Sequence, residues 1–136
     1  MAGYSGTPLV KKLGIKDGFK VAFVNEPNGL RKELTLPATV SVNAKSRQPL
    51  DFVLLFVKSQ QALEKDFSRY AEKLTAAGML WVSWPKKASG VQTDLNENIV
   101  REIGLLRGMV DVKVCAIDKV WSGLKFVFRL KDRPKK

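Results

Sequence analysis

The segment Leu50-Asp51-Phe52-Val53-Leu54-Leu55-Phe56-Val57 decides the fold, because all but one of its residues are apolar. A strand that is apolar on both faces is typical of the centre of a parallel sheet, with helices on either side. Ser59 is expected to cap the following helix, whose apolar residues recur at helical spacing and which we expect to end at Gly78. A strand over 80–84 then completes a βαβ unit with a right-handed crossover.

Upstream of this unit the sequence predicts further elements of the same kind. Thr7 and Pro8 have the pattern of an N-cap and a first helical residue, so we expect a short helix over 9–13. A nearly continuous apolar run predicts a strand over 20–25. A short helix over 30–34 and a proline-containing edge strand within 36–42 follow.

Downstream, Asp94 and Glu97 have the spacing of a capping box, which predicts a helix that ends at Gly108. A strand is expected over 111–117. Trp121-Ser122-Gly123 is then expected to turn the chain into a final strand over 124–130. The apolar residues of that strand alternate, which favours an antiparallel strand with one wetter face. This final strand is expected to be exposed, although Lys125 and Arg129 disfavour its pairing with a second copy.

Together these elements predict an α/β fold: one small Rossmann-like three-layer sandwich with a mostly parallel sheet and an antiparallel C-terminal strand. We expect a single domain over residues 1–130 and a basic, disordered tail over 131–136. The 136 residues, 45% hydrophobic and 27% charged, suit one soluble globular domain. We see no membrane-spanning run and no signal-peptide pattern, so we expect a cytoplasmic protein.

Two residue counts narrow the chemistry. The single cysteine, Cys115, excludes an internal disulfide and a cysteine cluster for zinc, and it is expected to be a core residue. Histidine is absent, which removes imidazole bases, imidazole metal ligands and Ser-His or Cys-His nucleophile pairs. We therefore expect no metal site and no catalytic residues, and we lean against an enzyme.

The net charge of +11, from 24 basic and 13 acidic residues, favours an anionic partner. An anionic small molecule, a nucleotide, RNA or DNA would each fit. A merely solubilising surface is the alternative, because the basic residues are spread along the chain. The sequence does not indicate an oligomeric state.

Loops that follow parallel strands meet at one edge of the sheet, where ligands usually bind. The central candidate is the basic loop 84–93, because its lysines and its glycine precede a predicted helix N-terminus. Each residue also has a structural interpretation: Trp84 as a cap of the core, the lysine pair as a solubilising group, Asn25 as a turn cap. The candidate ligand-binding residues at this edge are Asn25, Glu26, Pro27, Lys58, Ser59, Trp84, Lys86, Lys87, Ser89, Gly90, Trp121 and Ser122.

The run 50–57, the helix after it and Ala77-Gly78-Met79-Leu80-Trp81-Val82 resemble the C-terminal half of class I S-adenosylmethionine-dependent methyltransferases. This resemblance implies a methyltransferase-like fold. It also implies a glycine-rich turn after the first strand and a carboxylate at the end of the second. Here Asn25-Glu26-Pro27-Asn28-Gly29 stands in place of that turn, and Glu33 is the sole carboxylate within 30–50. We therefore expect no cofactor, with S-adenosylmethionine as the alternative.

Three longer segments look like an uncharacterised bacterial family of short proteins known only as a domain of unknown function. They are the opening 1–9, the run Leu80-Trp81-Val82-Ser83-Trp84-Pro85-Lys86-Lys87-Ala88-Ser89-Gly90 and the run 110–118. The resemblance covers nearly the whole chain. It implies a bacterial, cytoplasmic protein and brings no activity with it.

Three functional hypotheses follow from the sequence. The first is a non-catalytic module that binds an anionic small molecule or a nucleotide at the C-terminal edge of the sheet. The second is a divergent S-adenosylmethionine-dependent methyltransferase-like enzyme, which rests on the fold. The third is a basic nucleic-acid-associated protein, which rests on net charge. We favour the first, because the loop 84–93 offers cationic groups and the chain has no histidine.

Overall fold

The computed structural model describes residues 8–42 and 49–132, and within these residues six strands form one sheet. In chain order the strands are β1 (Lys20–Val24), β2 (Ser41–Val42), β3 (Leu50–Phe56), β4 (Leu74–Pro85), β5 (Met109–Ala116) and β6 (Trp121–Phe128). The helices are α1 (Leu9–Leu13), α2 (Leu30–Glu33), α3 (Gln60–Ala71) and α4 (Glu97–Leu106), with 3-10 turns at η1 (Lys87–Ser89) and η2 (Leu130–Asp132).

The strands lie in the order β2-β1-β3-β4-β6-β5. β1 pairs in parallel with β2 and β3, and β3 with β4, whereas β6 is antiparallel to both β4 and β5. The predicted fold class is therefore confirmed: a mostly parallel sheet with an antiparallel C-terminal strand. The predicted position of that strand is wrong, because β6 lies between two neighbours and β5 forms the exposed edge.

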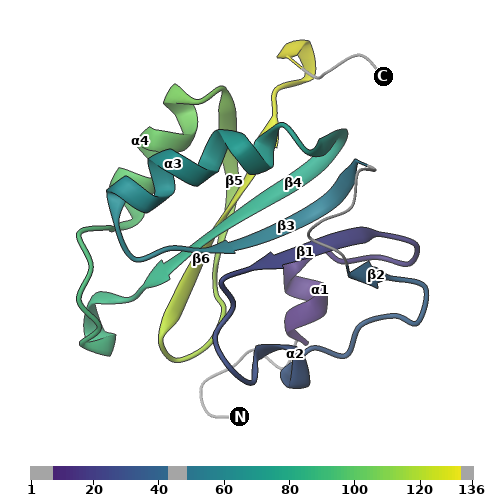
Figure 1. Cartoon of the computed structure of the whole chain (residues 1–136), viewed down its shortest axis with the longest axis horizontal. Coiled ribbons are helices and arrows are strands. Elements are labelled where there is room, and N and C mark those ends of the chain that lie inside the picture. Colours follow the sequence, from purple (N-terminus) through teal and green to yellow (C-terminus); the bar gives the residue numbers. More distant parts are fainter. Residues whose placement is uncertain (1–7, 43–48, 133–136) are drawn as a thin grey trace.

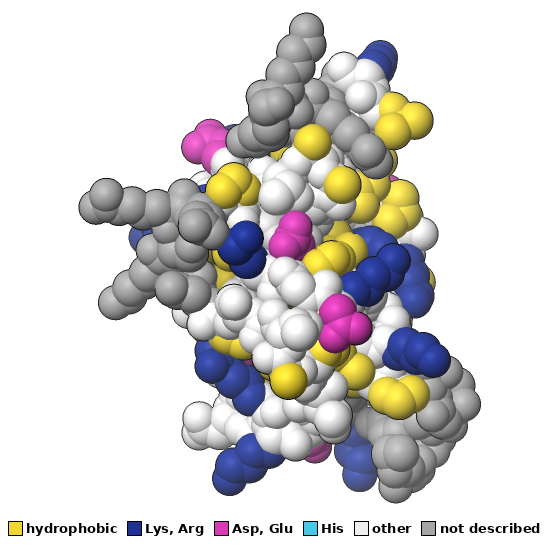
Figure 2. Space-filling view, turned by 90° about the vertical axis from the view of Figure 1, so that its right-hand side faces the viewer, with side chains coloured by type: hydrophobic (Ala, Val, Ile, Leu, Met, Phe, Trp, Pro, Cys, Tyr) yellow, Lys and Arg dark blue, Asp and Glu magenta, His cyan; other side chains and the backbone are white. Residues whose placement is uncertain are grey.

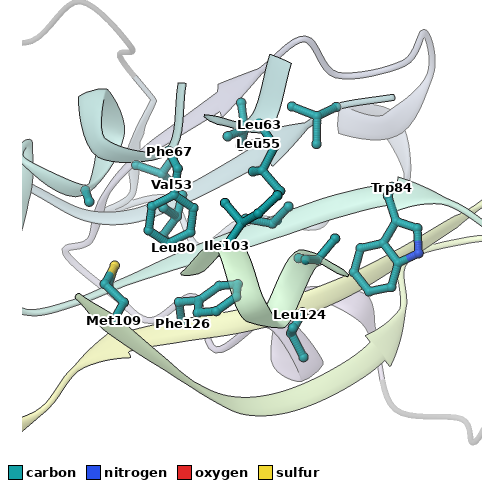
Figure 3. Close-up of a cluster of buried hydrophobic side chains, with 14 of the residues drawn as sticks. Val53, Leu55, Leu63, Phe67, Leu80, Trp84, Ile103, Met109, Leu124 and Phe126 are labelled. Carbon is teal, nitrogen blue, oxygen red and sulfur yellow. The ribbon is translucent and has the colours of Figure 1, made fainter. Parts of the chain in front are cut away.

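Two helical layers cover the sheet, with α3 and α4 on one face and α1 and α2 on the other (Figure 1). On the first face, Phe67 of α3 meets Phe126 of β6 edge to face, with ring centroids 5.2 Å apart (Figure 3). On the second face, the indole N–H of Trp81 donates to the carbonyl of Leu13 at 2.9 Å and fixes the end of α1. Each large apolar side chain buried in this way contributes about 1.5–3 kcal/mol.

Two predicted boundaries are wrong for reasons of packing. α3 ends at Ala71 and β4 begins at Leu74, so Gly78 lies inside a strand instead of ending a helix. A Cβ on Gly78 would lie 3.0 Å from the carbonyl oxygen of Leu50, so a larger residue would be crowded where β3 and β4 pair irregularly. Trp121-Ser122-Gly123 lies within β6, and the turn before it is closed by Asp118, whose carboxylate accepts from Val120 and Trp121 N–H groups.

The helix starts were predicted with mixed success. Ser59 caps α3 as expected, accepting a hydrogen bond from the Ala62 N–H at 3.1 Å. The N-cap of α4 is Asn96, whose side chain accepts from Ile99 N–H, so the capping box expected at Asp94 is not formed. Pro8 occupies the N-cap position of α1 instead of the first helical position, and Thr7 lies outside the described residues.

Basic side chains do not gather into one patch on the side of the molecule that Figure 2 shows. Figure 2 shows the side of the molecule where the parallel strands begin, with lysine and arginine side chains scattered around its margin among hydrophobic and uncharged ones. Of the expected tail, Lys131 and Asp132 belong to η2, and residues 133–136 lie outside the described part of the chain. The polar loop before β3 also falls largely outside it.

Candidate functional site at the carboxyl ends of the strands

The strand order reverses between β1 and β3. From β1 the chain passes to β2 on one side, and it then returns to form β3 on the other side of β1. Such a reversal separates the two connections and leaves a crevice outside the carboxyl ends of the strands, which is where ligands bind in open α/β sheets. The structure therefore points to the residues that follow β1 and β3.

Asn25 follows β1 directly and takes a left-handed backbone conformation, with φ of 60°. This conformation is rare for residues other than glycine, and asparagine tolerates it better than most. Its side-chain amide donates a long hydrogen bond, 3.4 Å, to the carbonyl of Phe56 at the end of β3. Asn25 thus bridges the two strands between which the order reverses, and its exposed side chain does more than cap a turn.

The turn after Asn25 is held by an ion pair. The Arg31 guanidinium donates to the carboxylate of Glu26 at 2.7 Å and also lies over the ring of Phe23, 5.3 Å from its centroid. Pro27 accepts from the Leu30 N–H through its carbonyl at 3.3 Å. These contacts fix how the chain enters α2 and leave Glu26 half-buried beside the rim.

The residues after β3 are covered by the loop that follows β4. The Thr93 hydroxyl donates to the Lys58 carbonyl at 2.6 Å. Gln60 donates two hydrogen bonds to Asp94: its backbone N–H to the carboxylate at 2.8 Å, and its side-chain amide to the backbone carbonyl at 3.1 Å. The N-terminus of α3 is therefore occupied by the protein's own carboxylate. The side chain of Lys58 remains exposed.

The expected anion cradle in the basic loop is not formed. The Ser89 hydroxyl donates to the Lys86 carbonyl at 2.6 Å and accepts from the Val91 N–H, so it serves the turn itself. Gly90 has φ of 78° and ends η1, and residues 91–96 separate this turn from α4. Lys87 is exposed and Lys86 is half-buried. The sequence predicted that a helix N-terminus would lie beside them, but α4 begins only at Glu97.

The two rim tryptophans are core residues. Trp84 is 5% exposed and packs in the cluster beneath α3 and α4 (Figure 3). Trp121 is 8% exposed and packs on the opposite face, edge-on to Phe56 with ring centroids 5.0 Å apart. The two candidate ligand-binding residues therefore pack on opposite faces of the sheet and do not come together at one site. Ser122 is half-buried in β6, opposite Trp84 and Ala116.

Sequence reasoning missed Ser83. Among the described residues, its hydroxyl is the one buried side-chain polar atom without a hydrogen-bond partner. Ser83 lies near the end of β4, opposite Phe56 of β3 and Gly123 of β6. Leaving a buried hydroxyl unpaired is costly, so the position calls for an explanation. A serine in an otherwise apolar strand is the signal that the sequence offered.

Other classes of site are not found in residues 8–42 and 49–132. No group of three or more acidic or cysteine side chains there is placed to hold a metal ion. None of the helices in these ranges is long and apolar enough to cross a membrane.

The fold is similar to that of solved S-adenosylmethionine-dependent methyltransferases. Magnesium protoporphyrin IX methyltransferase from Synechocystis, solved with bound SAH, matches with a TM-score of 0.59 at 12% identity, over 89% of this chain and 78% of that one. A SAM-dependent methyltransferase from Aquifex aeolicus matches with 0.58 at 15% identity, over 87% and 86%. A ribosomal protein L11 methylase from Lactobacillus delbrueckii matches with 0.59 at 10% identity, over 89% and 75%.

No family model matches the sequence, and no curated protein matches it. The expected resemblance to a bacterial family of unknown function thus gains no support, whereas the methyltransferase-like fold is confirmed. The preference for a non-catalytic anion-binding module is overturned, because the structurally similar proteins are methyltransferases. Their fold agrees better with the methyltransferase-like alternative, and the expectations of no enzyme and no cofactor are not confirmed.

Proposed function

We propose that the protein is a divergent methyltransferase that binds S-adenosylmethionine where β1 and β3 end. The observation that carries this proposal is the reversal of strand order between β1 and β3, bridged by Asn25. The similarity of the whole sheet to solved methyltransferases supports it, including one with bound SAH.

The residues at this edge fit such a cofactor in part. The left-handed turn at Asn25 redirects the backbone at the rim without a glycine, and the half-buried Glu26 supplies a carboxylate that can accept hydrogen bonds from a ribose diol. The exposed ammonium of Lys58 suits a carboxylate. The unpaired hydroxyl of Ser83 is a further polar group near the same edge. These four residues would hold the cofactor.

The missing histidines are compatible with this chemistry. S-adenosylmethionine supplies an activated methyl group on a cationic sulfur. Transfer to a nucleophile depends mainly on holding the two reacting groups in line and close together. The rigid parts of the rim, tied by the Glu26–Arg31 ion pair and the Asp94–Gln60 hydrogen bond, can provide that positioning.

The test is a backbone-amide NMR titration of the assigned protein with S-adenosylhomocysteine. We expect saturable shifts at 25–29 and at 58–60, with smaller changes at Ser83. Glu26→Gln should weaken binding, because the amide replaces one carboxylate oxygen with a donor. Glu64→Gln, on the exposed side of α3, is the matched control and should bind like the unmodified protein.

Two results would overturn the proposal. One is the absence of saturable shifts at millimolar ligand in a protein whose spectrum shows that it is folded. The other is saturable binding whose shifts lie away from the ends of β1 and β3, with Glu26→Gln and Glu64→Gln equally affected.

A further inference from the structure

Lysines from three parts of the chain converge on the α1 face of the sheet. Lys113 of β5 and Lys125 of β6 lie directly opposite each other in the antiparallel pairing, so their side chains share one face. The Lys113 ammonium donates to the carbonyl of Lys12 at the end of α1 at 2.9 Å. The Lys125 ammonium lies beside Gly14, 4.0 Å from where a Cβ would stand. Lys16 follows α1 and completes what we call the lysine cluster: Lys12, Lys16, Lys113 and Lys125.

This arrangement is electrostatically unfavourable for the protein alone. Like charges directly opposite in a β-ladder destabilise it. The pKa of Lys125 is lowered, first by burial and then by the charges of Lys113 and Lys16. The positive charges of the lysine cluster also act on Cys115. Burial raises the pKa of its thiol, while the charges of Lys113 and Lys12 partly offset this by lowering it.

The nearby carboxylates do not relieve the charge. Among the described residues, no ion pair joins Lys16, Lys113 or Lys125 to an acidic side chain. Asp17, next to Lys16, accepts a hydrogen bond from Thr39. Asp111, two residues before Lys113, pairs with Arg101 of α4. Lys16, Lys113 and Lys125 therefore keep the capacity to bind acidic groups of a ligand.

The lysine cluster is separate from the site proposed above. Lys125 stands four residues along β6 from Trp121 at the rim, about 13 Å at the rise of a β-strand. Lys113 and Lys125 lie on β5 and β6, the two strands furthest from β1. A ligand of the lysine cluster would therefore approach the side of the sheet that α1 covers, away from Asn25 and Glu26.

We propose that the lysine cluster binds the phosphodiester backbone of a nucleic acid. The net charge of +11 favours a polyanion, which gains from the whole field of the protein and from the convergent ammonium groups. Lysine ammonium groups bind phosphate oxygens as point charges without requiring a particular base. The proposal extends beyond the methyltransferase activity and does not depend on it.

The experiment measures the anisotropy of a labelled single-stranded RNA of about 20 nucleotides, and of a DNA duplex of similar length, between about 50 and 200 mM KCl. The test variant is Lys16→Gln with Lys113→Gln and Lys125→Gln. The control variant removes the same charge from the opposite layer: Lys65→Gln with Lys73→Gln and Arg107→Gln, three exposed residues of the α3 and α4 side. Circular dichroism confirms that each variant is folded.

We expect the slope of log affinity against log salt to become shallower by about 2–3 in the test variant, from about 0.7–0.9 per phosphate contact. The control variant should change the slope by less than about 1, because its three basic residues lie outside the lysine cluster. Equal losses in the two variants would overturn the proposal, since they would show that net charge alone acts. So would the lack of RNA and DNA binding by the unmodified protein, or binding of inorganic phosphate alone.

The outcome is distinguishable from that of the proposed function. The test variant should still show S-adenosylhomocysteine shifts at 25–29, because it leaves the ends of β1 and β3 unchanged. Loss of nucleic-acid binding with those shifts retained would locate the two activities at separate sites.

Discussion

Asp94 accepts a hydrogen bond from the backbone N–H of Gln60 at 2.8 Å, so the loop after β4 closes the N-terminus of the helix after β3. The Thr93–Lys58 hydrogen bond lies beside it and repeats the same connection. The first turn of a helix carries unpaired N–H groups and a partial positive charge, which a carboxylate satisfies. Asp94 and Thr93 therefore hold two loops of the candidate site together.

Replacing Asp94 should weaken the fold by an amount typical of a lost cap. We expect Asp94→Ala to lower the free energy of unfolding by about 0.5–2 kcal/mol. Asp94→Asn keeps an acceptor and loses only the charge, worth about 0.3–1 kcal/mol at a helix end. Urea denaturation measures both changes. Glu64→Ala, an exposed acidic residue of the same helix, is the control, and an Asp94→Ala midpoint equal to that of Glu64→Ala would contradict this account.

Gly104 marks the closest approach of α4 to the sheet. A Cβ at this position would lie 2.1 Å from the ring of Phe126, which is fully buried against Phe67. We expect Gly104→Ala to lower the free energy of unfolding by about 1–3 kcal/mol through overpacking, although alanine favours helices elsewhere. Thermal unfolding measures the loss.

A double-mutant cycle tests this explanation directly. Phe126→Leu makes room and loses stability alone, but it should restore part of the loss in Gly104→Ala because the clash disappears. Additive losses in the double variant would show that the glycine serves another purpose. Glu102→Ala, exposed on the same helix, should change stability little.

The parts of the fold that could be predicted are those fixed by local chemistry. The apolar run around Leu54 predicted the buried central strand, and Ser59 predicted the start of α3, because a strand buried on both faces and a capping hydroxyl leave direct marks in the sequence. Alternation in 124–130 predicted the wetter face of β6 correctly: Leu124 and Phe126 face α3 and α4, while Lys125 lies with the lysine cluster.

The errors arose where a long-range contact decided between two local options. Asp94 and Asn96 both suit a helix start, and the contact of Asp94 with Gln60 left Asn96 as the cap. Glycine is common at helix ends, but Gly78 lies inside β4, where the close approach of Leu50 favours a small residue. The burial of Trp84 was one of two interpretations that the sequence left open, because an aromatic residue at a strand end suits either the core or a ligand.

Lys125 should reduce the stability of the folded protein at neutral pH, because its positive charge repels that of Lys113 on the neighbouring strand. We expect Lys125→Gln to raise the free energy of unfolding by about 0.2–1 kcal/mol. The pKa of Lys125 is lower in the folded protein, so the unfolded chain holds more protons between that pKa and the ordinary value of 10.5. The contribution of Lys125 to stability therefore rises with pH across this window.

The stability advantage of Lys125→Gln should accordingly shrink as pH rises towards 10.5. Urea denaturation at neutral and alkaline pH measures the difference between the variant and the unmodified protein, so that changes from Cys115 and other groups cancel. Lys65→Gln, which removes an exposed lysine of α3, is the control. A Lys125→Gln protein less stable than the parent at neutral pH would contradict the electrostatic account.

Ser83 separates a structural role from a functional one. Its hydroxyl is buried without a partner in the described chain, so Ser83→Ala should leave the free energy of unfolding unchanged or raise it by up to about 1 kcal/mol.

A residue that costs stability and yet stands near the proposed cofactor site is expected to serve binding, because functional groups are often retained at such a cost. We therefore expect Ser83→Ala to bind S-adenosylhomocysteine several-fold more weakly, measured by calorimetry, while Ser122→Ala on the neighbouring strand binds normally. A marked loss of stability in Ser83→Ala would show that the hydroxyl has a structural partner. Unchanged affinity would remove Ser83 from the site and leave the end of β4 with a packing role alone.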